Sequence, residues 1–257
     1  MRAIKNLFVL AIILAVIAGG AAIALRVARG KPSPAEQVKP NVFSVSAAGI
    51  YLYAARVGTH VVLFDTGADP EGTPVSAALA ALGASRNDVS DIFITHAHGD
   101  HTAGAAAFGS AKIHLGAADA AMAEKKAEPT QLIPKLAAKV LAVPPVTAQD
   151  QLAGATSVDL GDSKLVKTFP MPGHTPGSYA FLYDGVLFVG DAMVFKQGRL
   201  DRSAKMLDTD SEQAKRSIAG LKTALTGNEV DIVCTGHGGC TPKGLGKNLL
   251  DDFIARL

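Results

Sequence analysis

Potential metal ligands are concentrated directly after one predicted strand. His96, His98, Asp100 and His101 follow the apolar run Ile92–Thr95, so four candidate ligands fall within six residues. Imidazole and carboxylate groups suit zinc or iron, and a tight turn after a buried strand can direct several of them into one pocket. The chain has only seven histidines, and three of them are here, which argues against a merely solvated loop. The run predicts a metal site.

Three further candidates occupy the same kind of position later in the chain. His174, Asp191 and His237 each follow an apolar run and lie beside glycine residues. Taken singly, a histidine in a turn or an aspartate at a strand end is commonly a structural or capping residue. The repeated order of apolar strand, glycine and ligand favours one shared site, because strands of one sheet can bring their ends together along a single edge.

Short apolar runs that are typical of buried strands alternate with helical segments. The predicted strands are His60–Asp65, Asp91–Thr95, Lys112–Leu115, Leu165–Phe169, Ser178–Tyr183, Val186–Val189 and Val230–Cys234. One predicted helix is Pro74–Leu82, with Thr73 as its cap. Another begins at the capping box Thr209-x-x-Glu212 and runs to about Thr226. Three more are predicted over Ala117–Lys126, Gln131–Lys139 and Leu245–Ile254. Asp184-Gly185 predicts a hairpin turn. This mixture indicates an α/β or α+β domain.

The combination resembles the metallo-β-lactamase-fold hydrolases over residues 42–240. The resemblance is carried by the H-x-H-x-D-H signature, by three later ligands and by an early strand-end aspartate, which are His96, His98, Asp100, His101, His174, Asp191, His237 and Asp65. It implies a four-layer αβ/βα sandwich, here preceded by an N-terminal hydrophobic helix, with the site at one edge of its two sheets. It also implies one metal ion on His96, His98 and His174. A second would lie on Asp100, His101 and His237, with Asp191 bridging the two and Asp65 supporting the site without binding metal.

The same resemblance implies a metal-dependent hydrolase with two Zn²⁺ ions. Paired cations lower the pKa of bound water from 15.7 towards about 7, so a metal-bridging hydroxide would cleave an ester, thioester or related acyl bond in a small molecule. The chain has no G-x-S-x-G elbow, so no serine nucleophile is indicated. Asp100 is the candidate catalytic residue, because it can orient the hydroxide as well as bind metal.

Departures from known subfamilies leave the substrate open. True metallo-β-lactamases are not expected to have a bridging aspartate at Asp191, and homoserine-lactone lactonases carry a tyrosine shortly after it, where this chain has Ala192-Met-Val194. Glyoxalase II shares the ligands but adds a helical C-terminal domain, whereas 17 residues follow Cys240 here. A lactonase-like or β-lactamase-like hydrolase is one alternative. Another is a mononuclear iron enzyme with one Fe²⁺, similar to the persulfide dioxygenases.

Other polar and sulfur-containing residues carry weaker signals. Lys196 and Arg199 follow the bridging aspartate and could attract an anionic substrate, although a solvated charged loop is the alternative interpretation. His60 and His114 lie in or beside strands and are interpreted as structural. Cys234 and Cys240 flank His237, and a buried thiol, a thiolate ligand and a disulfide all stay open.

The first 29 residues predict a membrane anchor or a signal segment. Leu7–Leu25 is an uncharged run of 19 residues that would span about 28 Å as a helix, close to the bilayer's hydrocarbon thickness. A membrane anchor through residues 7–25 fits this length, a cleaved signal fits Ala22-Ile23-Ala24, and a buried core helix is the third alternative. Residues 30–41 then form a proline-containing linker and residues 42–257 the catalytic domain, which we expect on the extracytoplasmic (periplasmic) side.

Charge distribution excludes one class of partner. Residues 1–31 carry a net +5, so the formal +2 of the whole chain leaves −3 on the remainder. The catalytic part therefore has no electrostatic footprint for nucleic acid, and a small-molecule substrate is expected. The oligomeric state is not encoded in any recognisable pattern.

Overall fold

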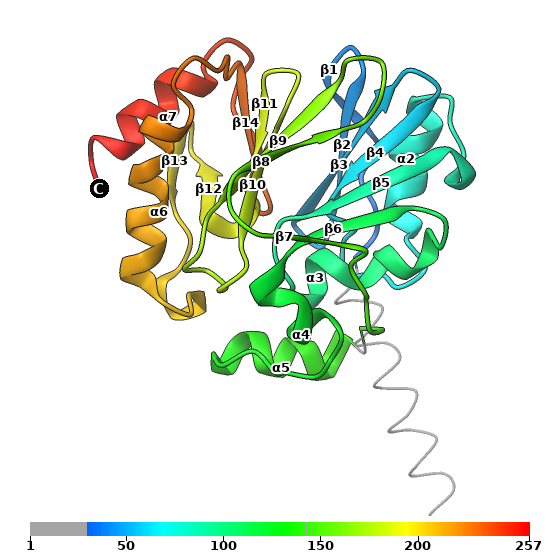
Figure 1. The fold of residues 1–257 in the computed structure, drawn as a ribbon, viewed down its shortest axis with the longest axis horizontal. Helices are drawn as coiled ribbons and strands as arrows, with labels where there is room; N and C mark the ends of the chain where they lie inside the picture. Colours follow the sequence, from blue (N-terminus) through cyan, green and yellow to red (C-terminus); the bar gives the residue numbers. More distant parts are fainter. Residues whose placement is uncertain (1–29, 142) are drawn as a thin grey trace, which may run out of the picture.

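The computed structural model describes residues 30–141 and 143–257. Within these ranges no helix is both long enough and apolar enough to cross a bilayer. The anchor or signal expected for residues 1–29, including the apolar run 7–25, lies outside the described residues. The described part consists of two facing β-sheets with helices on their outer sides (Figure 1).

The first sheet has seven strands in sequential order. They are β1 (Glu36–Lys39), β2 (Val42–Ala47), β3 (Ile50–Val57), β4 (His60–Phe64), β5 (Val89–Ile94), β6 (Lys112–Gly116) and β7 (Asp150–Leu152). Strands β1 to β4 pair antiparallel, and β4 to β7 pair parallel. Strand β1 falls within residues 30–41, so the predicted linker is wrong over Glu36–Lys39, which pair with β2 as an edge strand.

The second sheet has six strands, and a separate hairpin lies beside it. In spatial order the strands are β15 (Gly239–Cys240), β14 (Ile232–Thr235), β11 (Val186–Phe188), β10 (Tyr179–Tyr183), β9 (Leu165–Pro170) and β8 (Thr156–Asp159). Only β11 and β14 pair parallel. The hairpin is formed by β12 (Met193–Lys196) and β13 (Arg199–Arg202), where sequence analysis predicted no strand.

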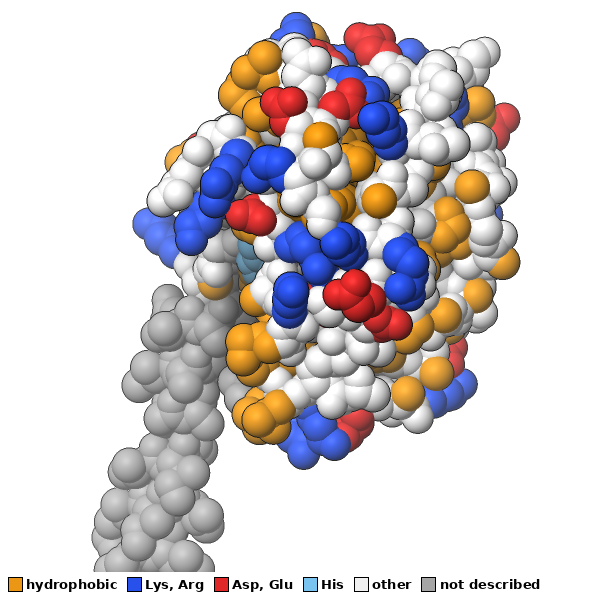
Figure 2. Space-filling model, turned by 90° about the vertical axis from the view of Figure 1, so that its left-hand side faces the viewer, with side chains coloured by type: hydrophobic (Ala, Val, Ile, Leu, Met, Phe, Trp, Pro, Cys, Tyr) orange, Lys and Arg blue, Asp and Glu red, His pale blue; other side chains and the backbone are white. Residues whose placement is uncertain are grey.

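Helices cover both outer faces and one end. They are α2 (Thr73–Ala81), α3 (Gly99–Thr102), α4 (Ala120–Ala123), α5 (Leu132–Leu141), α6 (Ser211–Ala224) and α7 (Gly246–Ile254), with short 3₁₀ turns at Arg86–Asp88, Ala103–Ala107, Ala117–Asp119, Gly190–Ala192 and Lys205–Leu207. Helix α2 lies on one side of the sandwich and α6 and α7 on the other, while α3, α4 and α5 lie at the lower end in Figure 1. Hydrophobic side chains are visible at that end in Figure 2, and Leu132, Ile133 and Leu136 of α5 are exposed.

Three apolar clusters account for this layering. Alternate residues of a strand point to opposite faces, so neighbours such as Leu63 and Phe64 in β4 belong to different clusters. Leu63 belongs to the cluster that includes Val75 and Leu79 of α2, whereas Phe64 stacks on Phe188 of the second sheet with ring centroids 3.8 Å apart. The third cluster joins the second sheet to α6 and α7. The result is the expected four-layer sandwich.

Two helix starts differ from the sequence prediction. Gly72, with φ of 62°, is the N-cap of α2, so Thr73 is the first helical residue instead of the cap. Asp210 caps α6, its carboxylate accepting from Gln213 N at 2.8 Å. Thr209 lies one residue too early to cap, and its hydroxyl donates to the His174 carbonyl at 3.1 Å.

The two histidines interpreted as structural lie away from the candidate site. His114 is fully buried in β6 and hydrogen-bonds to Asp91 at 2.8 Å and Asp150 at 2.7 Å, linking three neighbouring strands. His60 is exposed at the start of β4. Both observations agree with a role outside metal binding.

Candidate metal centre

The seven predicted ligands lie at one end of the sandwich, where the two sheets meet. His96, His98, Asp100 and His101 follow the end of β5, and the remaining three follow β9, β11 and β14 of the second sheet. The expectation of a single sheet edge is therefore corrected, because the ends of strands from both sheets converge. All seven side chains fall into groups whose ligand atoms lie within 4.8 Å of one another.

The first group consists of three buried histidines. His98 Nδ1 lies 3.1 Å from His96 Nε2 and 3.1 Å from His174 Nε2. The three imidazoles meet edge to face, with ring centroids 4.7 to 4.9 Å apart. Three nitrogen atoms that approach this closely form the triangular donor set of a tetrahedral metal site with one open position.

The second group combines one carboxylate with two histidines. His101 Nε2 lies 3.7 Å from Asp100 Oδ2, and His237 Nε2 lies 3.5 Å from the same oxygen. His101 is fully buried, but 41% of the His237 side chain is exposed, so this group is reached from solvent on the His237 side.

Asp191 connects the two groups. Its Oδ1 lies 3.4 Å from His101 Nε2, and its Oδ2 lies 3.7 Å from His174 Nε2 and 3.3 Å from His237 Nε2. The carboxylate therefore faces ligands of both sets. Gly236 makes this approach possible, because a Cβ at that position would lie 2.2 Å from Asp191 Oδ1.

The two groups differ in their proton affinity. Burial, together with the neighbouring imidazoles, holds the pKa of His96 well below its usual value and lowers that of His98 to about 4. Burial also opposes charge on His237, but the Asp191 and Asp100 carboxylates outweigh it and raise the pKa of His237 to about 10. In the same way, burial would raise the pKa of Asp100, yet His101 and His237 bring it to about 2.

The donor set fits two divalent cations. His101 Nε2 and Asp191 Oδ1 are buried, and neither makes a hydrogen bond to any residue in the described ranges. Buried polar atoms without partners are rare in folded proteins, and an ion is one recognised explanation. Borderline-soft cations such as zinc accept this mixture of imidazole and carboxylate ligands.

Comparison with known proteins identifies the family. A sequence model described as the metallo-beta-lactamase superfamily matches residues 48–237, which include all seven predicted ligands. The chain belongs to the metallo-β-lactamase superfamily. Over 147 residues it is 34% identical to a hydroxyacylglutathione hydrolase of Anaeromyxobacter dehalogenans (strain 2CP-C), a match that covers 56% of this chain and 46% of that protein. The matched part is thus about half the length of this relative.

Solved structures of the superfamily share the fold. BJP-1, a subclass B3 metallo-β-lactamase of Bradyrhizobium japonicum, superposes with a TM-score of 0.61 at 24% identity, covering 81% of this chain and 79% of that one. A metallo-β-lactamase with an HARLDQ motif from Cronobacter sakazakii gives 0.62 at 22% identity, covering 82% and 80%. At these identities the likeness concerns the fold alone.

Asp65 lies behind the ligands of this superfamily member. It has a positive φ of 58° at the end of β4, and its carboxylate accepts from His101 Nδ1 at 2.8 Å. The same carboxylate accepts from Thr95 N and Thr95 Oγ1, both at 2.8 Å. Because a hydrogen bond to one ring nitrogen fixes the orientation of the other, Asp65 aims His101 Nε2 at the second group.

Two buried aspartates that sequence analysis missed hold the first group in place. Asp119 lies between the loop of His98 and the loop of His174, and Asp208 Oδ1 lies 3.2 Å from His174 Nδ1. Arg202 donates to Asp208 at 3.2 Å and thereby anchors it to α6 through Ser211. Asp119 shares the order of apolar strand, glycine and acid after Lys112–Leu115, a signal that could have revealed it. Asp208 carries no comparable signal.

Lys196 and Arg199 are not brought to the ligands. Both are exposed beside the Gln197-Gly198 turn of the β12–β13 hairpin, and Arg199 pairs with Asp201 at 3.4 Å. Neither makes a hydrogen bond or ion pair with a predicted ligand in the part of the chain that the structure describes. Their assignment as substrate-binding residues therefore has no geometric support.

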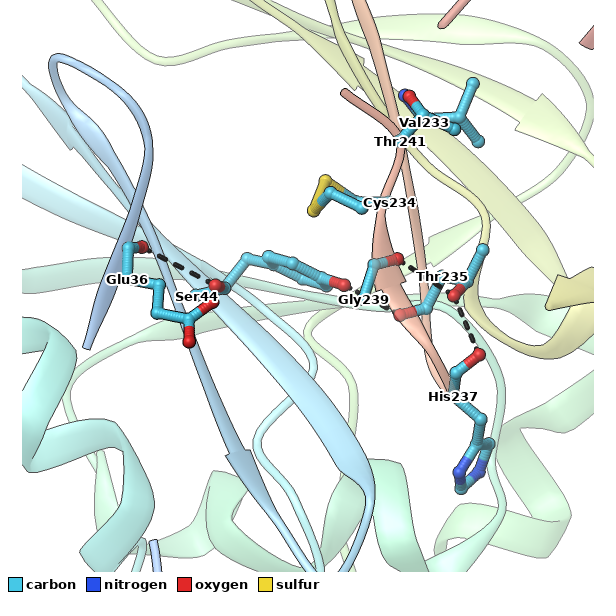
Figure 3. Close-up of a disulfide and its surroundings, with 10 residues drawn as sticks. Glu36, Ser44, Val233, Cys234, Thr235, His237, Gly239 and Thr241 are labelled. Carbon is cyan, nitrogen blue, oxygen red and sulfur yellow. Dashed lines mark hydrogen bonds between the residues drawn. A yellow bond between two sulfur atoms is a disulfide. The ribbon is translucent and has the colours of Figure 1, made fainter. Parts of the chain in front are cut away.

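A disulfide closes the hairpin that carries His237. Cys234 and Cys240 face each other across β14 and β15 with their Cα atoms 4.1 Å apart, and they are bonded through their sulfurs. Figure 3 shows the His237 imidazole projecting from the loop away from this bond, while the Thr235 hydroxyl donates to the carbonyls of His237 at 2.9 Å and Gly239 at 3.0 Å. Neither sulfur is therefore a free thiolate ligand.

The contrast in pKa predicts that the two groups lose metal at different pH. His96 and His98 already hold neutral imidazoles at neutral pH, whereas a cation must displace a proton from His237, whose pKa is about 10. For each proton that a cation must displace, the affinity of the second group for that cation should fall about tenfold with every pH unit below 10. We expect about two zinc ions per chain after dialysis at pH 8 and about one at pH 5.5, measured by plasma mass spectrometry. Simultaneous loss of both ions would contradict this order.

Proposed function

We propose that the chain is a binuclear metallo-hydrolase that cleaves an ester, thioester or related acyl bond in a small molecule. The observation that carries this proposal is the convergence of seven ligands into two groups with Asp191 between them. A protein that had lost catalysis would have little reason to keep both groups complete. The similarity to a protein named as a hydroxyacylglutathione hydrolase also supports hydrolysis.

Each group has a distinct part in the proposed chemistry. His96, His98 and His174 would hold one cation, Asp100, His101 and His237 the other, and Asp191 would contact both. When bound, the two cations would supply Lewis acidity that polarises a carbonyl and lowers the pKa of water towards about 7.

In this proposal Asp100 orients the attacking water. Its carboxylate has 27% of its surface exposed, and its pKa of about 2 keeps it ionised at neutral pH. An ionised carboxylate on the open side of the site accepts a hydrogen bond from water and fixes its direction of approach. Because His237 is the most exposed ligand, the substrate would enter from the side of His237 and Asp100.

Metal content and turnover of the purified full-length chain test this proposal. We expect about two zinc ions per chain by plasma mass spectrometry and hydrolysis of at least one compound in a panel of esters, thioesters and lactones. Activity should disappear with a chelator and return with zinc. One iron ion per chain with oxygen consumption on a persulfide substrate would overturn the hydrolase proposal.

We further propose that the catalytic domain works outside the cytoplasm, tethered or exported through residues 7–25. The Cys234–Cys240 bond supports this location, because disulfides persist mainly in oxidising compartments. In protein taken from cells with thiols trapped at lysis, we expect neither cysteine to react with a maleimide before reduction and both to react afterwards. Immediate labelling of both cysteines would contradict an oxidising location.

A further inference from the structure

An open cleft of about 120 Å³ adjoins the first group of ligands. His98 forms part of its wall, together with residues from α4, from the segment 127–131, and from the loop that carries His174. This His98 cleft is therefore bounded by both loops of the first group. Thr209, whose hydroxyl donates to the His174 carbonyl, closes another part of its wall.

The lining of the His98 cleft is largely apolar and made of small side chains. Its apolar members are Ala118, Ala121, Met122, Ala127, Pro129 and Pro176. Among the described residues, no lysine or arginine lines it, and the one carboxylate in its wall, Glu128, is paired with Lys135 at 2.7 Å. Such a surface favours an apolar group over a charged one.

A second cavity, of about 160 Å³, is lined in part by the same segment of the chain. It shares Met122 and the segment 127–129 with the His98 cleft, and it is lined by Lys125, Lys135 and Lys139. Since Lys135 is neutralised by Glu128, Lys125 and Lys139 leave this cavity with net positive charge. Ala97 and Gly99, the two neighbours of His98, also line it, so the two cavities flank one metal ligand.

We infer that the substrate places a short apolar acyl group in the His98 cleft and an anionic group beside Lys125 and Lys139. This inference rests on the proposed hydrolase function. Because a buried cavity of about 150 Å³ can hold a benzene molecule, the cleft suits an acyl group of roughly four to six carbons. The substrate class is then an ester or thioester of a short apolar acid with an anionic alcohol or thiol.

Binding of a homologous series of acids tests the apolar part without turnover. Acetate, butyrate and hexanoate are titrated calorimetrically into the full-length, zinc-loaded protein. We expect affinity to rise about fourfold for each added methylene, the gain typical of burying that group. Ala121→Phe and, independently, Ala118→Phe should abolish the gain, whereas Ala81→Phe, an exposed alanine of α2, should preserve it. Affinity that does not depend on chain length, or equal behaviour of all three variants, would overturn the inference.

The anionic part is tested with two thioesters that differ only in charge. Butyryl thioesters of 3-mercaptopropionate and of 3-mercaptopropanol are compared as substrates of the same protein. Lys125→Gln should raise KM for the anionic thioester about five- to tenfold and leave the neutral one unchanged. Lys126→Gln is the matched control, since Lys126 is 72% exposed, pairs with Glu124 and lines neither cavity. Equal effects of the two variants would refute the assignment.

The two proposals fail in different ways. If no ester or thioester is hydrolysed but affinity still rises along the acid series and is lost in the Ala121 variant, the cleft is supported and the hydrolase proposal fails. If hydrolysis occurs with no preference for chain length or charge, the hydrolase proposal holds and the inference about the substrate is wrong.

Discussion

Asp191→Asn is expected to remove the second metal ion and to lower kcat/KM by at least about a thousandfold. Loss of an outer-shell partner alone commonly costs 10- to 100-fold, and Asp191 faces ligands of both groups at 3.3 to 3.7 Å. An asparagine keeps the shape of the side chain but loses the negative charge that favours positive charge on the neighbouring imidazoles. Metal stoichiometry and steady-state kinetics on the purified variant measure both effects.

A second readout distinguishes this electrostatic role from simple misfolding. The Asp191 charge is the largest favourable contribution to the raised pKa of His237, so the substitution should bring that pKa down from about 10 towards its usual range. Histidine NMR titration of the metal-free protein measures it directly. Asp201→Asn, at an exposed aspartate of β13, is the matched control. Wild-type metal content and turnover in the Asp191 variant would refute its bridging role.

Asp119→Ala should destabilise the protein and selectively weaken the first group. The Asp119 carboxylate is fully buried and accepts from Ala97 N at 2.8 Å, Thr175 Oγ1 at 2.7 Å and Gly177 N at 2.8 Å. Each buried donor left without a partner costs about 1–3 kcal/mol, so we expect a loss of at least about 3 kcal/mol in the free energy of unfolding. For a domain of this size the melting temperature should fall by roughly 10 °C.

Metal affinity separates the positioning role of Asp119 from a purely structural one. Ala97 lies between His96 and His98, and Thr175 directly follows His174, so one carboxylate ties together the two loops that carry the first group. Affinity for the first cation should fall 10- to 100-fold, the usual effect of a supporting shell, with a smaller change at the second. Asp88→Ala removes an exposed capping carboxylate as a control. An equal loss of affinity for both cations would indicate general destabilisation only.

Hairpin turns show which parts of the fold were accessible from sequence. Three two-residue turns, Ala48-Gly49, Asp184-Gly185 and Gln197-Gly198, have positive φ at both positions. Only Asp184-Gly185 has the Asp-Gly composition that marks such turns, and it alone was predicted. Alanine and glutamine rarely adopt positive φ, so β2, β3, β12 and β13 escaped detection.

The residues of the candidate site also differ in how far they could be predicted from the sequence. The seven predicted ligands follow apolar strands and are close in sequence to the structure that positions them, so their positions could be singled out from the sequence. Asp119 contacts Thr175 across 56 positions and Asp208 contacts His174 across 34. The position of Asp119 after a strand and a glycine gave a signal, but the partners of both aspartates become visible only in the packed fold. The His98 cleft likewise joins residues that are distant in sequence, because α4 and the loop of His174 both line it.

Because the predicted ligands are divided between the two sheets, folding of both sheets is expected to precede metal binding. Four predicted ligands follow β5 of the first sheet, and the other three follow strands of the second sheet. A nascent chain that has emerged as far as β7 presents no complete donor set. Both halves would therefore have to fold and dock before either proposed cation could meet a complete set of ligands. A bound cation would then link the two halves, so its binding free energy would stabilise the docked arrangement against separation of the halves.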